Sequence, residues 1–393
     1  MIGAGMWTAV VFVAGWFIGA FIWQPAMLAN ATPASKPASL APAGPSLYDE
    51  AWSRARDNFV GQVPTDTVRD YAAIRAAFAT LDDRYTFFIE PQIRTAERDH
   101  MRGQFGGIGV TFVVNEAGFV VLTPRAGGSA ENAGIRAGDR LVRIDGVALP
   151  HPAKADDVAA VRGEVGTPVR IGVLRGEATP ELEFVVTREL VQVASVEWRV
   201  VTRDGAKVGV IQIRQFTERT GAEVTQALTE LRAAGVRGYV LDLRDNGGGL
   251  LAAAVDVASE FLDRGIVLIE NKRDAQEVAY TVRDDKADSA PLAVLINKGS
   301  ASASEVVAGA LRDHQRSKLI GENSYGKGSV QLIFDLKDGS SVHVTTAKWV
   351  TPNRTVIDGA GLKPDIEVLR AAGEAEAGVD SQLDKAVSVV IDQ

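Results

Sequence analysis

The C-terminal half of the chain alternates short runs of consecutive apolar residues with segments of helical spacing, and no other sequence feature constrains the fold more. Runs that are apolar throughout are typical of strands in a sheet that is covered on both faces. Strands that alternate with helices predict an α/β core. The expected strands are 207–213, 239–243, 266–270 and 292–296, the expected helices are 220–234, 250–261 and 304–314, and a hairpin follows at 330–336 and 341–348 around Asp338-Gly339.

Two other patterns precede this core, and 393 residues are enough for several domains. Residues 47–101 carry apolar side chains at helical spacing, which predicts a small helical domain for packing or dimerisation rather than chemistry. From 102 to 188 the period changes to two between glycine-rich turns, which predicts a compact β-rich module with one helix at 155–162. We therefore expect a multidomain α/β protein whose core spans 189–370, with a linker and a helix at 371–393.

The amino terminus is strongly apolar. Residues 6–23 form an 18-residue run whose only polar side chain is Thr8, and the first charged side chain is Lys36. Because that length can cross one bilayer as a helix, we interpret 1–31 as a transmembrane anchor. The alternative is a signal peptide cleaved after Ala31, since Ala29-Asn30-Ala31 offers a small-residue site. Residues 32–46, rich in Pro, Ala and Ser, are interpreted as an extended linker.

Composition argues against several functions. The 42 Lys and Arg face 50 Asp and Glu, and without a basic run this net charge of −8 argues against a nucleic-acid partner. The chain has no Cys and its four His are far apart, so we expect no metal site and no cofactor. It also lacks the G-x-S-x-G elbow of α/β-hydrolases. The segment 321–328 imitates a phosphate-binding loop, but Gly328 stands where Ser or Thr is needed and a strand follows instead of a helix.

A serine-rich turn at 297–305 is the best candidate for chemistry, because a buried strand precedes it and a helix follows. Ser302 and Glu305 match the S-x-x-E capping box, so a simple helix cap also explains this segment. A hydroxyl at a helix N-terminus lies beside free N–H groups and the positive end of the dipole, which suits an oxyanion. Without a usable His, Lys327 is the candidate base because burial lowers a lysine pKa, and a solvated loop lysine is the alternative.

A glycine-rich loop runs directly into the first strand of the β-rich module. It consists of Phe105, Gly106, Gly107, Ile108 and Gly109. Closely spaced glycines let backbone N–H groups converge on an anion, and the adjoining strand edge can accept a peptide strand, although a bland turn explains the glycines equally well. Together with 128–146, which contains Ala133-Gly134-Ile135 and Gly138-Asp139, the loop resembles that of a PDZ domain. This resemblance implies binding of a free peptide carboxyl terminus.

Three segments of the core resemble the signature of the carboxyl-terminal processing peptidases, also called tail-specific proteases. They are 299–313, 321–331 and the glycine-rich strand end 241–250. With the PDZ-like module placed before the core, the resemblance covers residues 47 to about 390. The chain departs from the family at 81–86, where Leu81-Asp82-Asp83-Arg84-Tyr85-Thr86 replaces the usual LDPHS. We expect this departure to affect domain contacts rather than catalysis.

The resemblance implies a Ser-Lys serine peptidase with a crotonase/ClpP-like α/β core and an inserted PDZ domain. Carried over by motif, Ser302 is the nucleophile in preference to Ser300 and Ser304, Lys327 is the general base, and Gln331 holds the lysine. The backbone N–H groups of Gly248 and Ala303 would form the oxyanion hole. Arg162, at the end of the PDZ-like helix, would couple tail binding to the site.

The expected function is therefore cleavage of protein or peptide substrates that are recognised by their free C-termini. The alternative is a membrane-tethered PDZ scaffold with an inactive core, while a crotonase-like acyl-transfer enzyme would leave the PDZ module unexplained. The resemblance also implies an extracytoplasmic location, on the periplasmic or cell-surface side, with the protein anchored by one helix or secreted after cleavage at Ala31. The sequence leaves the substrate, a homo-oligomer and an adaptor protein open.

Overall fold

The computed structural model describes residues 46–176, 180–283, 287–371, 373–374 and 378–393. The expected membrane segment at 1–31, and all of the linker 32–46 except its last residue, lie outside these ranges. Among the described residues, no helix combines the length and the apolar character needed to cross a bilayer. The anchor therefore stays a prediction from sequence.

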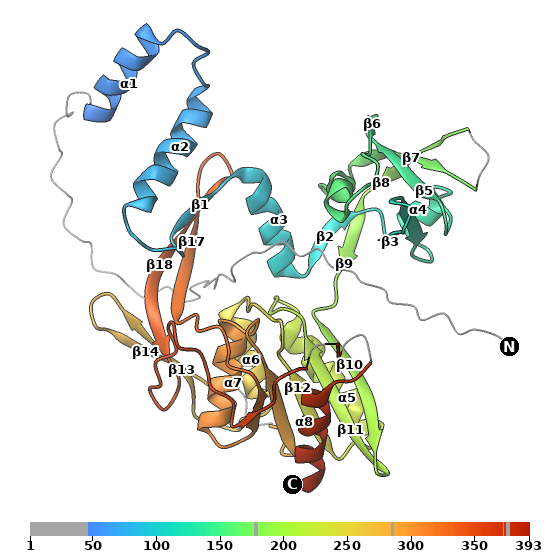
Figure 1. Ribbon diagram of the computed structural model, residues 1–393, viewed down its shortest axis with the longest axis vertical. Helices are drawn as coiled ribbons and strands as arrows, with labels where there is room; N and C mark the ends of the chain where they lie inside the picture. Colours follow the sequence, from blue (N-terminus) through green and yellow to red (C-terminus); the bar gives the residue numbers. More distant parts are fainter. Residues whose placement is uncertain (1–45, 177–179, 284–286, 372, 375–377) are drawn as a thin grey trace.

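The core is a six-stranded sheet in the order β10-β11-β12-β15-β16-β19, with helices on both faces (Figure 1). Strands β11 to β19 of this order are parallel, and β10 pairs antiparallel with β11 at one edge. One apolar cluster joins the sheet to α5, α6 and α7, and another joins it to α8, which confirms the predicted α/β core. The elements are β10 (Val196–Arg203), β11 (Ala206–Ile213), α5 (Thr220–Ala233), β12 (Gly238–Asp242), α6 (Leu251–Ser259), β15 (Leu292–Ile296), α7 (Ala303–Asp313), β16 (Lys318–Gly321), β19 (Ile366–Glu367) and α8 (Ser381–Asp392).

A second sheet is built on the predicted hairpin, which consists of β17 (Ser329–Asp335) and β18 (Ser341–Val350). The strand expected at 266–270 belongs to this sheet rather than to the core sheet: it is β13 (Ile266–Lys272), which pairs with β18 and with β14 (Glu277–Thr281). Strand β18 pairs with β17 along one edge, and along the opposite edge it pairs with β13 and with β1 (Phe87–Ile89), a strand from the N-terminal part of the chain. The hairpin thus joins the N-terminal part to the core.

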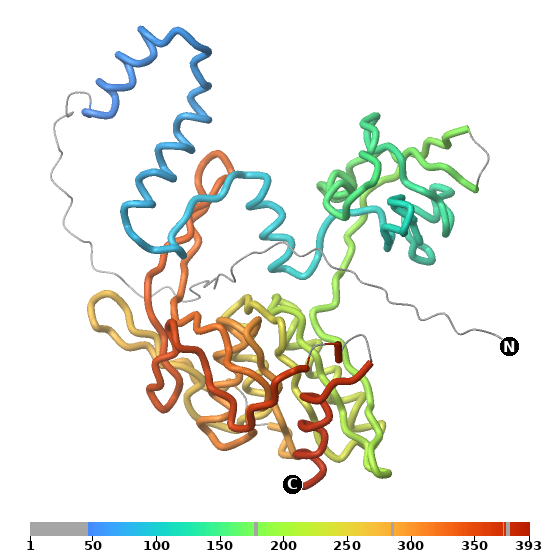
Figure 2. Tube along the Cα trace, viewed as in Figure 1, coloured from blue at the N-terminus to red at the C-terminus, as the bar shows by residue number. Residues whose placement is uncertain are grey.

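The β-rich module has a sheet in the order β3-β4-β5-β7-β8, with β6 added beside β5. Its elements are β3 (Val110–Val114), β4 (Val120–Pro124), α4 (Ser129–Asn132), β5 (Arg140–Ile144), β6 (Val147–Ala148), η1 (Ala155–Val161), β7 (Pro168–Leu174) and β8 (Leu182–Thr187). The segment expected to be a helix at 155–162 is the 3-10 helix η1. Its buried residues are Val158 and Val161. Strands β2 (Gln104–Gly107) and β9 (Glu189–Gln192) pair and connect the module to the rest, as the trace in Figure 2 shows.

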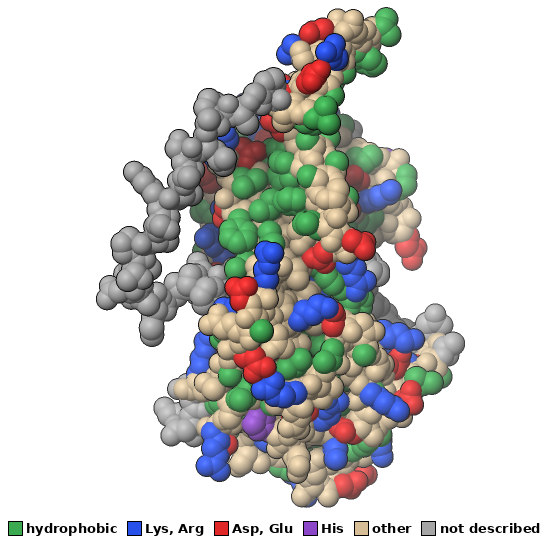
Figure 3. Space-filling model, turned by 90° about the vertical axis from the view of Figure 1, so that its left-hand side faces the viewer, with side chains coloured by type: hydrophobic (Ala, Val, Ile, Leu, Met, Phe, Trp, Pro, Cys, Tyr) green, Lys and Arg blue, Asp and Glu red, His purple; other side chains and the backbone are tan. Residues whose placement is uncertain are grey.

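The N-terminal part contains three helices, α1 (Leu47–Asn58), α2 (Asp66–Ala79) and α3 (Pro91–Arg102). Side chains of Ser46 and Thr65 cap α1 and α2, which explains where these helices begin. Neither helix contains a buried residue, whereas α3 buries Arg94, Glu97 and Met101. Figure 3 shows apolar side chains gathered over this part of the molecule.

Candidate active site

The serine-rich turn leaves β15 and enters α7, and its three serines differ in their hydrogen bonds. The Ser300 hydroxyl donates to the Leu243 carbonyl at 2.7 Å, and the Ser304 hydroxyl donates to the Asn246 carbonyl at 2.8 Å. The Ser302 hydroxyl is fully buried and has no partner within the described part of the chain. Ser302 also has a φ of 59°, a left-handed conformation that is costly for a residue with a Cβ.

The two residues expected to form an oxyanion hole lie on either side of Ser302. Ala303 is the first residue of α7, where helical geometry leaves the backbone N–H without an intrahelical acceptor. Gly248 has a φ of 107°, and a Cβ at this position would lie 2.8 Å from the Ser302 Cβ. The Gly248 N–H donates to Asn246 Oδ1 at 2.9 Å, so this donor is already engaged. The structure therefore brings both residues to the serine but shows a free N–H only at Ala303.

Lys327 is buried, with 1% of its surface exposed, and its Nζ donates to Gln331 Oε1 at 2.9 Å. The Gln331 amide is fixed in turn, because its Nε2 donates to the Tyr85 carbonyl. Burial first, and then the positive charge of Arg84, lower the pKa of Lys327 from 10.5 to about 7. A lysine in this environment is uncharged for a large fraction of the time near neutral pH, as a general base must be.

Glu305 joins the serine turn to the lysine loop, a role that the sequence did not reveal. Its Oε2 accepts hydrogen bonds from the backbone N–H groups of Ser302 at 2.8 Å and Lys327 at 2.9 Å. Its Oε1 accepts from the Gly326 N–H at 2.7 Å and from the Ser324 hydroxyl at 2.5 Å. The S-x-x-E pattern predicts the bond to Ser302, but not the three bonds to the loop 324–327.

Ser302 and Lys327 are tied together through Glu305, but they do not touch through their reactive atoms. Lys327 Nζ bonds to Gln331, and no hydrogen bond to the Ser302 hydroxyl forms in the described residues. Proton transfer from serine to lysine requires these atoms to come within hydrogen-bond reach, about 2.6–3.2 Å. For a proton to pass between them, the Lys327 side chain would first have to leave Gln331.

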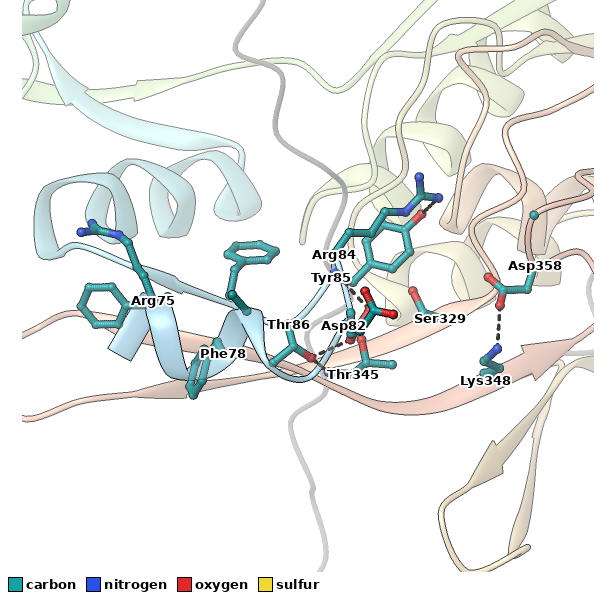
Figure 4. Close-up of a pocket in the computed structure, with 15 residues that line it drawn as sticks. Arg75, Phe78, Asp82, Arg84, Tyr85, Thr86, Ser329, Thr345, Lys348 and Asp358 are labelled. Carbon is teal, nitrogen blue, oxygen red and sulfur yellow. Dashed lines mark hydrogen bonds and ion pairs between the residues drawn. The ribbon is translucent and has the colours of Figure 1, made fainter. Parts of the chain in front are cut away.

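Tyr85, whose ring centroid lies 5.0 Å from Lys327 Nζ, also lines a cavity of about 1030 Å³ (Figure 4). This cavity lies between α2, the segment that leads into β1, and the hairpin of β17 and β18. Its walls carry both apolar rings and charges, including the ion pair of Lys348 and Asp358 at 2.8 Å. The departure from the family motif at 81–86 thus lies at the candidate site and not only at a domain contact.

The residues expected to bind a peptide tail lie in the β-rich module, away from the serine turn (Figure 1). The Arg162 guanidinium lies 4.3 Å from the centroid of the Phe105 ring. Gly106 and Gly107 do not form an open loop, since they belong to β2 and pair with β9. The buried Ile108 accepts a hydrogen bond from Ala130 N–H at 3.0 Å.

Gly109 follows with a φ of 69°. A Cβ at Gly109 would lie 2.2 Å from Glu189 Oε1, which pairs with Arg125 at 2.8 Å. The expected anion loop thus borders a carboxylate of the same chain.

An α/β core with a buried serine at a helix start, a buried lysine of lowered pKa and an added β-rich module is consistent with the class of serine peptidases that carry a second, β-rich domain. Comparison with known proteins agrees with this class. The model of peptidase family S41 matches residues 207–368, and that of the PDZ domain matches residues 106–186.

Two relatives cover most of the chain. The C-terminal processing peptidase of the Tetradesmus obliquus chloroplast is 37% identical over 82% of this chain and 73% of its own. The carboxyl-terminal-processing protease of Synechocystis is 35% identical over 80% of this chain and 74% of its own. A crystal structure from Bacteroides fragilis, assigned to the S41 proteases, shares the fold with a TM-score of 0.52 and 16% identity, covering 90% and 99% of the two chains. The chain belongs to the carboxyl-terminal processing peptidases of family S41, which act on protein substrates.

Proposed function

We propose that this protein is a serine endopeptidase in which Ser302 attacks the scissile carbonyl and Lys327 takes its proton. One observation carries the proposal: of the three serines in the turn, only Ser302 has an unpartnered hydroxyl, and it is tied through Glu305 to a buried lysine of lowered pKa. An unbonded hydroxyl in a strained turn is costly for folding, which is typical of a residue kept for chemistry.

The reaction follows from these positions. The neutral Lys327 amine turns from Gln331 toward Ser302, removes the hydroxyl proton, and the serine oxygen adds to the peptide carbonyl. The Ala303 N–H and the positive end of α7 stabilise the oxyanion, together with Gly248 once its N–H is released from Asn246. The Lys327 ammonium then protonates the leaving amine, and an acyl-enzyme forms. Water hydrolyses this ester with the lysine again acting as the base.

Turnover of an unfolded protein by the single and double variants tests the pair. Ser302→Ala and Lys327→Ala are each expected to abolish cleavage, and the double variant is expected to lose no more than either, because the two act as a unit. Ser304→Ala is the matched control and keeps most of the activity, since its hydroxyl bonds only to backbone. Full activity of Lys327→Ala, or inhibition by EDTA that added metal reverses, would overturn the proposal.

We also propose that the PDZ domain reads the carboxyl terminus of the substrate. The edge strand β3 can accept a peptide strand, and an incoming carboxylate would compete with Glu189 for the neighbourhood of Gly109 and Arg125. Matched substrates that end in a free acid or an amide test this, and the free acid should be cleaved faster. Equal rates would mean that the domain does not read tails.

The location and the assembly are further proposals. We place the core on the extracytoplasmic side of a membrane, tethered by the apolar run at 6–23 or released after cleavage at Ala31. Protection of the core from protease added to cells whose outer layers have been removed, but whose inner membrane is intact, would contradict this location.

We propose that α1 and α2 pack against a second copy of the chain, because neither helix contains a fully buried residue in the described monomer. Phe59 and Val68 are 61% and 57% exposed, so replacing both with Ser should lower the mass in solution to one chain without destabilising the monomer. A protein that is monomeric with both native residues would contradict the pairing and favour an adaptor protein.

The remaining alternative is a PDZ scaffold with an inactive core. This alternative predicts that neither the native protein nor Ser302→Ala cleaves a substrate, while both still bind peptide tails. The buried, uncompensated Ser302 hydroxyl argues against it, because a purely structural turn gains from satisfying or removing such a group.

A further inference from the structure

The segment between α2 and β1 leaves the helical part and enters the protease core. Tyr85 and Thr86 at its end are 5% and 8% exposed, although the helix α2 just before them contains no fully buried residue. The Asp83 carboxylate holds the turn, since it accepts from the Thr86 hydroxyl at 2.7 Å and from the Tyr85 N–H at 3.1 Å. This turn thereby fixes the backbone on which Arg84 and Tyr85 stand.

Tyr85 contacts the candidate base in two ways. Its carbonyl accepts the hydrogen bond from Gln331 Nε2, which orients Oε1 of the same amide toward Lys327 Nζ. Its ring lies over Nζ, with the centroid 5.0 Å away. The backbone of Tyr85, through Gln331, and the ring of Tyr85, directly, thus both position the Lys327 amine.

The Arg84 side chain packs against aromatic groups. Its guanidinium carbon is 4.6 Å from the centroid of Tyr85 and 5.6 Å from that of Tyr325, and its Nη2 donates to the Tyr85 hydroxyl (Figure 4). A guanidinium stays charged at every pH at which the protein is folded. It therefore places a permanent positive charge near the lysine.

We propose that Arg84 and Tyr85 are positioning residues for the base: Tyr85 orients Gln331 and covers the Lys327 amine, while Arg84 disfavours a second positive charge there. This inference rests on the proposed role of Lys327. It assigns to the N-terminal part of the chain a share in the active site, although the sequence predicts only packing or dimerisation for this part.

The other charges that act on Lys327 have the opposite sign. Glu305 on α7 and Asp83 on the same turn both favour the ammonium form of the lysine. Tyr85 is uncharged at neutral pH, because burial and a hydrogen bond with Tyr325 raise its pKa to about 12. Arg84 is therefore the group whose removal most directly favours protonation of the base.

The pH dependence of kcat/KM tests the proposal with three variants of the full chain. Arg84→Gln should move the midpoint of the rising limb upward by about 0.5 to 1 pH unit, with activity recovered at high pH. Arg84→Lys keeps the charge and should restore most of the native midpoint. Arg75→Gln is the control, since Arg75 lines the same cavity but pairs with Glu90, and its midpoint should stay in place.

Tyr85→Ala adds a second readout. It keeps the backbone carbonyl that holds Gln331 but removes the ring over Lys327, so water gains access and the midpoint should again rise. Tyr85→Phe keeps the cover and should give the smaller shift. If Arg84→Gln and Tyr85→Ala lose activity uniformly at all pH values, the residues are structural and this inference is wrong. An active Lys327→Ala would instead refute the Ser-Lys mechanism itself.

Discussion

At the scale of single residues, burial of the Lys327 amine lowers the stability of the folded protein. Its pKa is about 7 in the folded protein and 10.5 when unperturbed, so the folded state disfavours the ammonium. Below pH 7 both states carry the proton and the folded state bears the full cost. Between pH 7 and pH 10.5 the unfolded state binds more protons, so this group makes the protein more stable as pH rises.

This linkage predicts opposite effects of Lys327→Met on activity and stability. The variant should be inactive, yet below pH 7 its free energy of unfolding should exceed that of the native protein by roughly a few kcal/mol, because an apolar side chain replaces a buried charge. The difference should shrink as the pH approaches 10. Urea unfolding at pH 6 and pH 9.5 measures it. A variant that is less stable than the native protein at pH 6 would show that the amine is not desolvated.

At the scale of elements, the first turn of α7 is held by one carboxylate that serves four donors. Glu305 is fully buried, and burial raises its pKa while its hydrogen bonds oppose the rise. This carboxylate fixes the helix start against the loop 324–327, so the relative position of Ser302 and Lys327 depends on it.

Glu305→Gln should therefore impair both the fold and the reaction. Its amide nitrogen would face N–H donors, leaving at least one buried donor unsatisfied, with an expected loss of about 1–3 kcal/mol of stability. The folded fraction should also lose most of its activity, since the serine and lysine segments are no longer joined. Glu322→Gln is the control, because the contacts of the Glu322 carboxylate with Lys298 and Gln382 are long, at 3.7 Å and 3.4 Å. Unchanged specific activity of folded Glu305→Gln would restrict Glu305 to a structural role.

The elements of the core were predictable because their signal is local. Continuous apolar strands and helical spacing placed β15 at its observed bounds and α5 within one residue. The short β16 was not predicted, and the helix expected at 155–162 is the seven-residue 3-10 helix η1. Elements of this length depend on tertiary contacts.

The candidate site was predictable only in part. The motifs predicted Ser302, Lys327 and Gln331 as site residues, but they gave no sign that Gln331 donates to Tyr85, 246 residues away in the chain. No local pattern relates such positions, and the turn at Asp83 gave only a mismatch to a family motif. For the same reason residues 105–109 were predicted as a glycine-rich loop, whereas Gly106 and Gly107 lie in β2 and pair with β9.

At the scale of the whole molecule, the PDZ domain, α3 and the protease core meet where α3 ends at Gly103. The Gly103 carbonyl accepts from Val193 N–H at 2.9 Å, just after β9, and the Met101 carbonyl accepts from Glu218 N–H at 3.0 Å in the core. Two residues before Glu218, Phe216 bonds to the Gly248 carbonyl at 3.0 Å, and Gly248 lies against Ser302. Backbone contacts therefore lead from the base of the PDZ domain to the serine turn.

This route predicts that Gly103→Ala weakens the response of the enzyme to the substrate tail. Gly103 has a φ of 66° and a Cβ would lie 3.1 Å from Thr217 Oγ1, so the variant strains the junction at a cost of about 1–2 kcal/mol. Cleavage should lose much of its preference for free-acid over amidated tails, while Ser302 still reacts with a small acylating probe. Gly127→Ala is the matched control, since Gly127 has a φ of 70° in the PDZ domain but open space around it. If the two variants keep the same tail preference, the response to the tail does not pass through this junction.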